Sequence, residues 1–490
     1  VHYLYAPAFT ALIAYLSQQL SLGLNQVQFA VSAAFGALAV WLAYDFGSEL
    51  QDKRLGRAMA LCMILGTGLY TAYLDSHFTA MLALVFLFAF FICVLRFMRE
   101  QRVLDAVVAG LLMGAVLITH PDTTIILTLG YVSWLATMWL GKPRPALRGW
   151  LVLALGVPLV ALIATLPWLL SIRPLLGADI VSPFTRSLDN LRLMTVYQGV
   201  IILPLALIGA VIGLRRREQS TLLAVGWLVL IFDFSVTGVI ETLFGGLLAP
   251  IFRYDYPFSI AWHGPIIPLA ILGGRGLLAI WDRFFEGRFG TFLHRAAVPA
   301  LIGGLVVIVA GIVLAPSLLP GAKDVLSVYG AFSSAADVDA MEWLKQNTPP
   351  DTLILNHPGP HEADWAPVIA ERETIYFRPQ PFFQDDGSGE VGSVDTFSPL
   401  QEQMLAFWRD PADPANADLL AQASVDYVLV PQVVGNPDSF ATMYRWRAPF
   451  TEARPMQSCV CDAPYLELVF DEDGAQVYAL AGTLPVATGD

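Results

Sequence analysis

Five groups of three lysines and arginines recur along the first 295 residues, and each group lies between two long apolar runs. The groups are Lys53, Arg54, Arg57; Arg96, Arg99, Arg102; Lys142, Arg144, Arg148; Arg215, Arg216, Arg217; and Arg283, Arg288, Arg295. Basic residues in alternate connections of an apolar chain are typical of the cytoplasmic loops of multi-pass membrane proteins. The pattern therefore predicts a bundle of membrane-spanning helices and indicates which of their ends face the cytoplasm.

The connections between these groups carry a different set of polar residues. They hold histidines, aspartates and two arginines: His77, His120, Asp122, Arg173, Asp179, Arg253, Asp255 and His263. Because the basic connections are predicted to be cytoplasmic, these residues should lie on the opposite side of the membrane. We therefore expect any chemistry at the outer face.

Ten apolar runs are long enough, at about 17 to 25 residues, to cross the hydrocarbon core of a bilayer. They lie near 27–46, 58–74, 79–95, 104–120, 123–140, 149–171, 199–214, 221–240, 264–281 and 297–316. A further run, 5–22, is shorter and is interrupted by three consecutive polar residues, so we expect an interfacial helix there rather than a span. The connection 51–57, which follows the first span, is predicted to be cytoplasmic, so the chain starts outside. Ten spans then return it to the outside after residue 316.

Charge divides the chain into two parts. Residues 1–320 carry 20 Lys and Arg against 15 Asp and Glu, whereas residues 321–490 carry 8 against 26. Anionic phospholipid and nucleic acid would both repel so acidic a segment, so it should face solvent. The sequence thus predicts a transmembrane domain over 1–320 and a soluble, extracytoplasmic domain over 321–490, with no nucleic-acid partner.

Helical and strand patterns alternate within the acidic part. Residues 334–350 have apolar residues at helical spacing and end in two prolines, while 351–356 and 425–432 are short buried strands. Residues 466–480 predict a hairpin around an Asp-Gly turn, and 383–398 predict a Gly- and Ser-rich loop. The expected fold class is a polytopic α-helical membrane protein with a C-terminal extracytoplasmic α/β domain.

Three ionisable residues at the outer ends of the predicted spans are candidates for catalysis. Asp75 and His77 join two spans in YLDSHFT, and Asp122 follows His120 in THPDTT. An ionisable group at the membrane is costly and is often functional. An aspartate in such a place also caps the helix that follows it. Both interpretations stay open for Asp75 and for Asp122.

An aromatic outer connection, FRYDYPFSIAWHGP (252–265), carries Arg253, Asp255 and His263. One interpretation is an aromatic belt at the headgroup level with an Arg253–Asp255 ion pair. The interpretation we favour is a binding site for a lipid phosphate, because guanidinium presents a planar fork of donors that suits phosphate. Arg173 begins the other long outer connection. Arg253, Arg173 and His263 are therefore the candidate donor-phosphate residues.

The sequence contains no motif that specifies a metal or a nucleotide. Six of the seven histidines fall on the predicted outer side, but no HxxxH or HExxH spacing on a predicted helix supports a metal, since His357 and His361 lie in a proline-rich turn. Cys459 and Cys461 are followed by no second ligand pair, and they are too close together to staple a fold. A need for a divalent cation is left open. Neither a Walker A motif nor GxSxG is present, so ATP-driven transport and serine hydrolysis are unsupported.

Several segments resemble the GT-C superfamily of polyprenyl-phosphate-dependent glycosyltransferases, in particular the dolichyl-phosphate-mannose protein mannosyltransferase and aminoarabinose transferase type. These are YAPAF (5–9), the helix pair around a basic turn (32–74), GLLMGAVLITHPDTTIIL (110–127), and FRYDYPF with PIIPLAILGGRGL (252–258 and 265–277). The strings MEWLKQNTPPDTLIL, WAPVIAERET and VDYVLV are similar to the outer domain appended to many bacterial members.

The resemblance implies an enzyme of the bacterial plasma membrane that transfers a hexosyl or pentosyl group from a polyprenyl-phosphate donor to a glycan, lipid or protein acceptor on the outer face. In this family a carboxylate of the first outer loop acts as general base on the acceptor. The sequence begins just before the first resembling element, so we expect the first span and its carboxylate to precede Val1. Two other functions stay open: a non-catalytic membrane scaffold or receptor with this architecture, and a lipid or polymer transporter.

Overall fold

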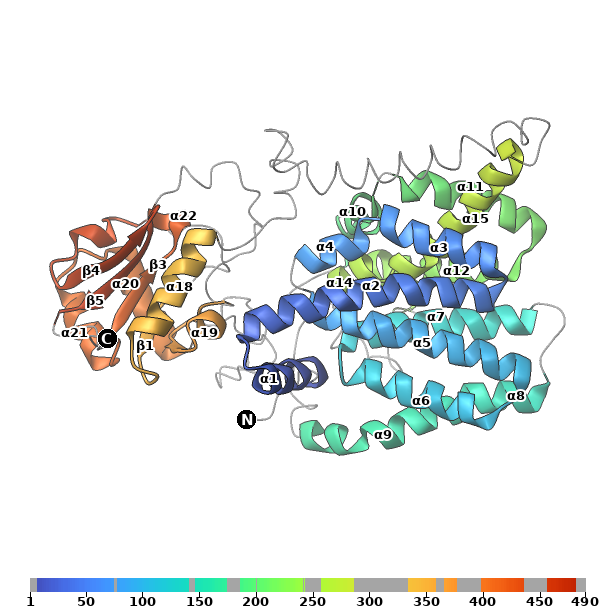
Figure 1. The fold of residues 1–490 in the computed structure, drawn as a ribbon, viewed down its shortest axis with the longest axis horizontal. Helices are drawn as coiled ribbons and strands as arrows, with labels where there is room; N and C mark the ends of the chain where they lie inside the picture. Colours follow the sequence, from blue (N-terminus) through green and yellow to red (C-terminus); the bar gives the residue numbers. More distant parts are fainter. Residues whose placement is uncertain are drawn as a thin grey trace. The chain divides into compact units, whose positions relative to one another are not determined.

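The computed structural model describes residues 7–74, 77–140, 146–173, 186–199, 201–240, 242, 257–285, 334–357, 365–376, 398–435 and 456–481 of the chain. The chain forms two compact units (Figure 1). The first, here the helical unit, comprises Val1–Leu20 and Val27–Val309, and the second, the α/β unit, comprises Ser21–Gln26 and Ala310–Asp490. The predicted boundary between residues 320 and 321 lies outside the described residues.

The helical unit is built from helices that run back and forth between two ends (Figure 1). They are α1 (Ala8–Leu20), α2 (Leu24–Leu50), α3 (Lys53–Leu65), α4 (Gly68–Leu74), α5 (Phe78–Glu100), α6 (Val103–Leu117), α7 (Pro121–Leu140), α8 (Leu147–Leu151), the π-helical η1 (Val152–Gly156), α9 (Val157–Ile172), α10 (Asn190–Thr195), the 3-10 helix η3 (Val196–Gln198), α11 (Ile202–Arg216), α12 (Gln219–Phe232), the π-helical η4 (Asp233–Thr237), α14 (Pro257–His263) and α15 (Ile266–Phe285).

Five continuous helical stretches among the described residues are long and apolar enough to cross a membrane: Leu24–Leu50, Phe78–Glu100, Leu147–Ile172, Gln219–Thr237 and Pro257–Arg283. A sixth span results if the bent pair Asn190–Gln198 and Ile202–Arg216, which meet at 98°, counts as one. The protein is thus a multi-pass membrane protein, as predicted.

The other predicted spans differ from single long apolar helices for identifiable reasons. The run 58–74 is divided into α3 and α4, α6 has only 15 residues, and α7 has 20 residues but carries an aspartate, four threonines and a serine. The run 297–316 lies outside the described residues. Helix α1, at 13 residues, is shorter than the roughly 20 that a span needs, and its interfacial location stays a prediction.

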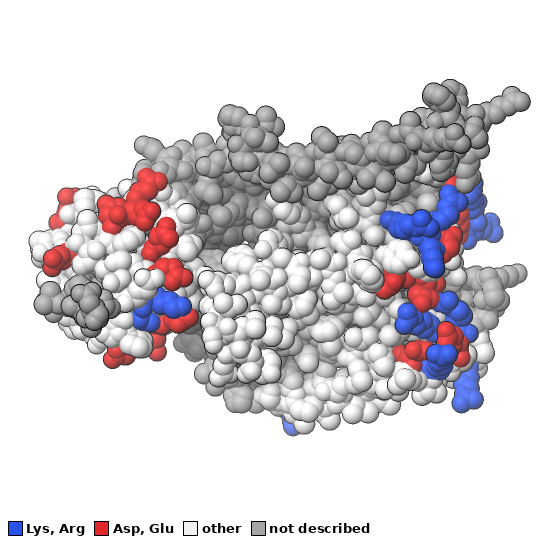
Figure 2. Space-filling model, viewed as in Figure 1, with Lys and Arg blue, Asp and Glu red and all other residues white. Residues whose placement is uncertain are grey.

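Charged side chains gather at one end of the helical unit on the face shown in Figure 2. The basic residues of this end pair with carboxylates that the same connections supply: Glu49 contacts Arg96 and Arg99, and Arg54 contacts Asp282. The helices therefore bring the separate basic groups of the sequence together at a single end. This is the end that the charge pattern predicts to be cytoplasmic.

The backbones of helices α11 and α15 are in direct contact at two glycines. A Cβ atom added at Gly209 would collide with the carbonyl oxygen of Leu272, and one added at Gly276 would collide with that of Leu205. Small residues that allow this close approach are typical of helix contacts in membranes, where packing rather than hydrophobic burial drives association.

We expect Gly209→Ala to lower the stability of the protein by about 1 to 3 kcal/mol, because the added methyl group forces the two backbones apart. Thermal unfolding of the purified protein in detergent measures the effect. Gly156→Ala is the matched control, since its Cβ would meet only the side chain of Val152 at an ordinary 3.8 Å. Equal melting temperatures for the two variants would show that α11 and α15 do not make this contact.

The α/β unit is a five-stranded sheet with helices on both faces. Its strands are β1 (Leu353–Leu355), β2 (Glu373–Thr374), β3 (Tyr427–Val430), β4 (Leu466–Glu472) and β5 (Ala475–Leu480), in the order β2-β1-β3-β5-β4. Strand β1 is parallel to β2 and β3, whereas β5 is antiparallel to β3 and β4. Its helices are α18 (Ala335–Asn347), α19 (Ala366–Ile369), α20 (Pro399–Arg409), α21 (Ala415–Gln422) and α22 (Gln432–Gly435).

The predicted elements of this unit are confirmed. The hairpin turns at Asp473 and Gly474, which both have positive φ (49° and 89°), as a tight hairpin turn requires. Successive side chains of a strand point to opposite faces of the sheet and fill one hydrophobic core on each face. Ile354, for example, packs with α18 on one face, and Leu355 packs with α20 on the other. The predicted loop 383–398 lies outside the described residues as far as Ser398, which caps α20.

Candidate functional site

Three helix corners meet at one end of the helical unit (Figure 1), and this end lies away from the charged residues shown in Figure 2. His77 precedes α5, His120 precedes α7, and α14 ends at His263. The Nδ1 atom of His77 lies 2.6 Å from the Nε2 atom of His263, although 186 residues separate them in the sequence. The ring of His120 meets that of His263 edge-on, with 6.3 Å between centroids. The fold thus gathers three imidazoles from distant segments.

The hydrogen bond between His77 and His263 has a chemical consequence. Two imidazole nitrogens can form it only when one carries a proton and the other offers a lone pair. The pair therefore holds a single proton between its two facing nitrogens. Such a pair can accept a proton from one side or give one up, which is the chemistry of general acid–base catalysis.

His120 is held differently, by the start of α7. Its Nδ1 atom accepts the backbone N–H of Thr123 at 3.2 Å and lies 2.8 Å from the Thr123 hydroxyl. Because the N–H donates to it, Nδ1 carries the lone pair, and the ring proton of neutral His120 is on Nε2. His120 therefore caps α7, and its orientation toward His263 is fixed by that cap.

Trp262 fixes the position of His263. Its indole is 2% exposed and its Nε1 donates to the Thr71 hydroxyl on α4 at 2.9 Å. Its carbonyl accepts the side-chain amide of Gln198 at 2.7 Å, and its ring packs against Tyr197 and His77 at centroid distances of 5.0 and 4.7 Å. Three separate segments therefore determine where the next residue, His263, lies.

The break between α3 and α4 belongs to the same arrangement. The amide of Thr67 donates to the carbonyl of Gln198 at 3.0 Å, and the Thr67 hydroxyl donates to the carbonyl of Tyr197 at 2.7 Å. Irregular backbone at membrane depth is tolerated where protein groups satisfy its hydrogen bonds. The break lets α4 approach η3 and places the Thr71 hydroxyl where it accepts the hydrogen bond of the Trp262 indole.

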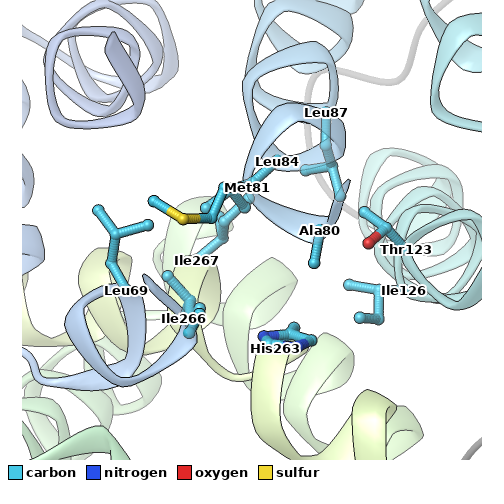
Figure 3. A pocket seen from close by; sticks show the side chains of 11 residues that line it. Leu69, Ala80, Met81, Leu84, Leu87, Thr123, Ile126, His263, Ile266 and Ile267 are labelled. Atoms are coloured by element: carbon cyan, nitrogen blue, oxygen red, sulfur yellow. The ribbon is translucent and has the colours of Figure 1, made fainter. Parts of the chain in front are cut away.

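An apolar cavity adjoins the imidazoles (Figure 3). His263 and Thr123 are the polar side chains among its lining residues, which are Leu69, Ala72, Ala80, Met81, Leu84, Leu87, Thr123, Ile126, His263, Ile266 and Ile267. In Figure 3 the His263 ring borders the cavity from the side of α14, and α5 forms another side. The His263 ring therefore has an apolar surface on one side.

Among the described residues, the structure brings two of the predicted site residues into direct contact. His77, a candidate for catalysis, and His263, a candidate for phosphate binding, are direct partners. Asp122 is buried in the first turn of α7, where its charge also favours the helix N-terminus. Arg173 is exposed at the end of α9. Asp75 and Arg253 lie outside the described residues.

A further carboxylate at this end was not singled out by the sequence. Asp233 accepts the Thr237 hydroxyl at 2.6 Å and the amides of Val239 and Ile240 at 2.9 and 3.0 Å. A carboxylate with these three donors is occupied in holding the π-helical turn η4, so we assign Asp233 a structural role. Among the described residues, no group of three His, Cys, Asp or Glu side chains is arranged to hold a metal ion.

Comparison with known proteins identifies the fold. A family model described as a family of unknown function, DUF6541, matches residues 7–482. The structure resembles the archaeal oligosaccharyltransferase AglB from Archaeoglobus fulgidus, solved with an inhibitory peptide and a dolichol-phosphate, with 14% identity and a TM-score of 0.54 over 99% of this chain and 67% of that one. The chain thus spans about two thirds of the length of AglB.

The structure also resembles ArnT from Cupriavidus metallidurans, solved bound to undecaprenyl phosphate, with 14% identity and a TM-score of 0.56 over 97% of this chain and 87% of that one. No curated protein matches the chain by sequence. Likeness at this identity establishes the fold, and the fold is that of the GT-C membrane glycosyltransferases, as the sequence resemblance predicted.

Proposed function

The chain belongs to the family of unknown function DUF6541, and we propose that it is a membrane glycosyltransferase that moves a sugar from a polyprenyl-phosphate-linked donor to an acceptor on the extracytoplasmic face of the bacterial plasma membrane. The proposal is supported by whole-chain likeness to two proteins solved with polyprenyl phosphates. It is also supported by the imidazole pair, which lies at the end of the bundle opposite the basic residues.

The single observation that carries the proposal is the hydrogen bond between His77 and His263. In sugar transfer the bond from the anomeric carbon to the phosphate oxygen breaks, a bond to the acceptor oxygen forms, and the acceptor hydroxyl loses its proton. We assign the imidazole pair to handling that proton. Asp75 and Asp122 remain candidates for acceptor contact, and Arg253 and Arg173 for the donor phosphate.

The proposal includes an orientation of the protein in the membrane. The positive-inside pattern favours a cytoplasmic location for the end that carries Glu49, Arg96 and Arg99. The histidine end and the acidic residues 321–490 are then extracytoplasmic. We propose that this second domain binds the acceptor, which is a glycan, a lipid or a protein.

Arg173→Ala should weaken the binding of undecaprenyl phosphate about tenfold or more, because a charge-assisted hydrogen bond to phosphate contributes roughly 1.5 to 3 kcal/mol. Binding to the purified protein in lipid nanodiscs measures this directly. Arg173 is exposed, so the variant should fold normally.

Arg148→Ala is the matched control for Arg173→Ala. Arg148 is also exposed and lies near the start of the continuous helical stretch Leu147–Ile172, whereas Arg173 directly follows its other end. If both variants bind like the unaltered protein, Arg173 is not part of the donor site. If both bind more weakly by the same factor, the effect is one of overall charge.

The two alternative functions predict different behaviour in the same nanodiscs and in vesicles. A scaffold or receptor would bind no lipid-linked sugar in preference to bulk phospholipid. A transporter would move the intact lipid or polymer across the bilayer without releasing its sugar. Retention of the sugar on a bound donor would therefore favour the transporter over the enzyme.

A further inference from the structure

Cys459 and Cys461 form a disulfide across a single intervening residue. Both cysteines are exposed, whereas Val460 between them is buried in the core of the α/β unit beside Tyr465 and Trp408. Closing a loop of three residues removes little conformational entropy from the unfolded chain. The cross-link is therefore accessible and contributes little to holding the fold, so stability does not explain it.

The segment that carries the two sulfurs is fixed by other bonds. The amide of Gln457 donates to the carbonyl of Arg409 at 2.7 Å, and the Ser458 hydroxyl accepts the amide of Ala412 at 2.9 Å. Within the turn, the amide of Asp462 donates to the carbonyl of Cys459 at 3.1 Å. These bonds do not depend on the disulfide, so the sulfurs stay adjacent when it is reduced, and oxidation can close it again.

The two sulfurs have different surroundings. The Sγ atom of Cys459 accepts the backbone N–H of Cys461 at 3.1 Å, whereas the Sγ atom of Cys461 lies 3.9 Å from the carboxylate of Asp462. A thiolate on Cys459 is stabilised by the N–H, and one on Cys461 is opposed by the carboxylate. In thiol–disulfide exchange the sulfur that leaves is the one that better holds negative charge. Cys459 is therefore the leaving sulfur and Cys461 the sulfur attacked.

The charges beside the pair favour particular reaction partners. Among the described residues, the segment that carries the pair and the segment bonded to it, 457–462 and 409–413, hold three aspartates and one arginine: Asp410, Asp413, Asp462 and Arg409. An attacking thiolate is already negative, so an additional negative group on the reagent is repelled and a positive group is attracted.

We propose that Cys459 and Cys461 form a thiol–disulfide exchange site for neutral or positively charged dithiols. A thiolate of the partner attacks Cys461 Sγ, which breaks the Cys459–Cys461 bond and releases Cys459 as a thiolate. The second thiolate of the partner then attacks the mixed disulfide and releases Cys461. The partner is oxidised to its disulfide, and the cysteine pair takes up the two electrons and two protons. This inference does not rest on the proposed glycosyltransferase function.

The test uses the purified full chain with cysteamine, 2-mercaptoethanol and 3-mercaptopropionate, which carry positive, neutral and negative groups. Alkylation followed by peptide mass spectrometry separates the Cys459–Cys461 thiols from Cys62 and Cys93. We expect reduction in the folded protein, with rates per thiolate that fall in the order positive, neutral, negative by about threefold per step at low salt and converge at high salt. The melting temperature should change by no more than about 2 °C on reduction.

Three variants extend the test. Asp462→Asn should raise the rate with all three reagents, because each attacks as a thiolate, and the rate with 3-mercaptopropionate should rise about threefold more than the rate with 2-mercaptoethanol. The single thiol of Cys461→Ser, which is Cys459, should react faster with uncharged iodoacetamide than the single thiol of Cys459→Ser. A pair that is reduced only as the α/β unit unfolds would be a structural cross-link and would overturn the proposal. If the reduction rates do not depend on the charge of the reagent, the assignment of neutral or positively charged dithiols as partners is wrong.

Discussion

Replacing His263 with glutamine should slow sugar transfer by about a hundredfold to a thousandfold, within the range that general acid–base groups contribute, while the protein stays folded. Glutamine keeps a polar side chain beside His77 but cannot accept and return a proton. The Nε2 atom of His263 is 2.6 Å from His77 Nδ1, so its loss removes the shared proton of the pair. Single-turnover rates with a saturating donor measure the effect on the transfer step separately from donor binding.

A double variant tests whether His77 and His263 act together. If they share one proton, His77→Gln combined with His263→Gln should cost little more than either change alone, because groups that act together are strongly non-additive. His357→Gln is the control, since this histidine packs on Trp408 in the α/β unit. Equal rates for His263→Gln and His357→Gln would remove the imidazole pair from the mechanism.

Replacing Trp262 with alanine should destabilise the helical unit by about 3 to 5 kcal/mol, the usual cost of deleting a large buried aromatic side chain. The change empties the space between Thr71, Tyr197 and His77 and leaves the Thr71 hydroxyl without its indole donor. We expect a large loss of monodisperse protein on size-exclusion chromatography and a lower melting temperature in detergent.

Trp41→Ala provides the comparison for Trp262→Ala. The Trp41 side chain is 67% exposed, and its indole bonds to Asp45 on its own helix. We expect its removal to change stability by no more than about 0.5 kcal/mol, as for exposed positions in general. Trp262→Phe should fall between the two, because it keeps the ring contacts and loses one hydrogen bond. If Trp262→Ala were as stable as Trp41→Ala, packing would not determine the position of His263.

Local patterns in the sequence predicted much of the architecture. The hairpin at Asp473 and Gly474 follows from the backbone that this dipeptide favours, and the strand around Ile354 follows from a short apolar run. The basic groups predicted the end at which charge gathers. Each of these signals depends on residues close together in the chain, so the sequence alone carries it.

The features that the sequence did not predict depend on contacts between distant residues. The division of α3 from α4 is stable because Gln198 and Tyr197, about 130 residues away, accept the hydrogen bonds of Thr67. His77 and His263 were both singled out, but for different roles, because nothing local to either shows that they meet. Thr71 falls in the apolar run 58–74 and Trp262 in the aromatic outer connection 252–265, and neither was singled out, although they position the pair.

The cysteine pattern illustrates the same limit. Spacing alone argued that Cys459 and Cys461 neither staple the fold nor match a metal site. Their pairing with each other, and the hydrogen bond that distinguishes one sulfur from the other, depend on the turn that Val460 anchors in the core.

The most direct test of the glycosyltransferase account is release of sugar from a lipid donor. The protein produced from its complete gene would be placed in proteoliposomes with a panel of undecaprenyl-phosphate hexoses and pentoses and with cell-envelope glycans, lipids and proteins as acceptors, and mass spectrometry would follow the undecaprenyl phosphate formed. We predict turnover of at least one donor, slowed about a hundredfold or more by His263→Gln. Binding of undecaprenyl phosphate without release of sugar from any donor would contradict the account.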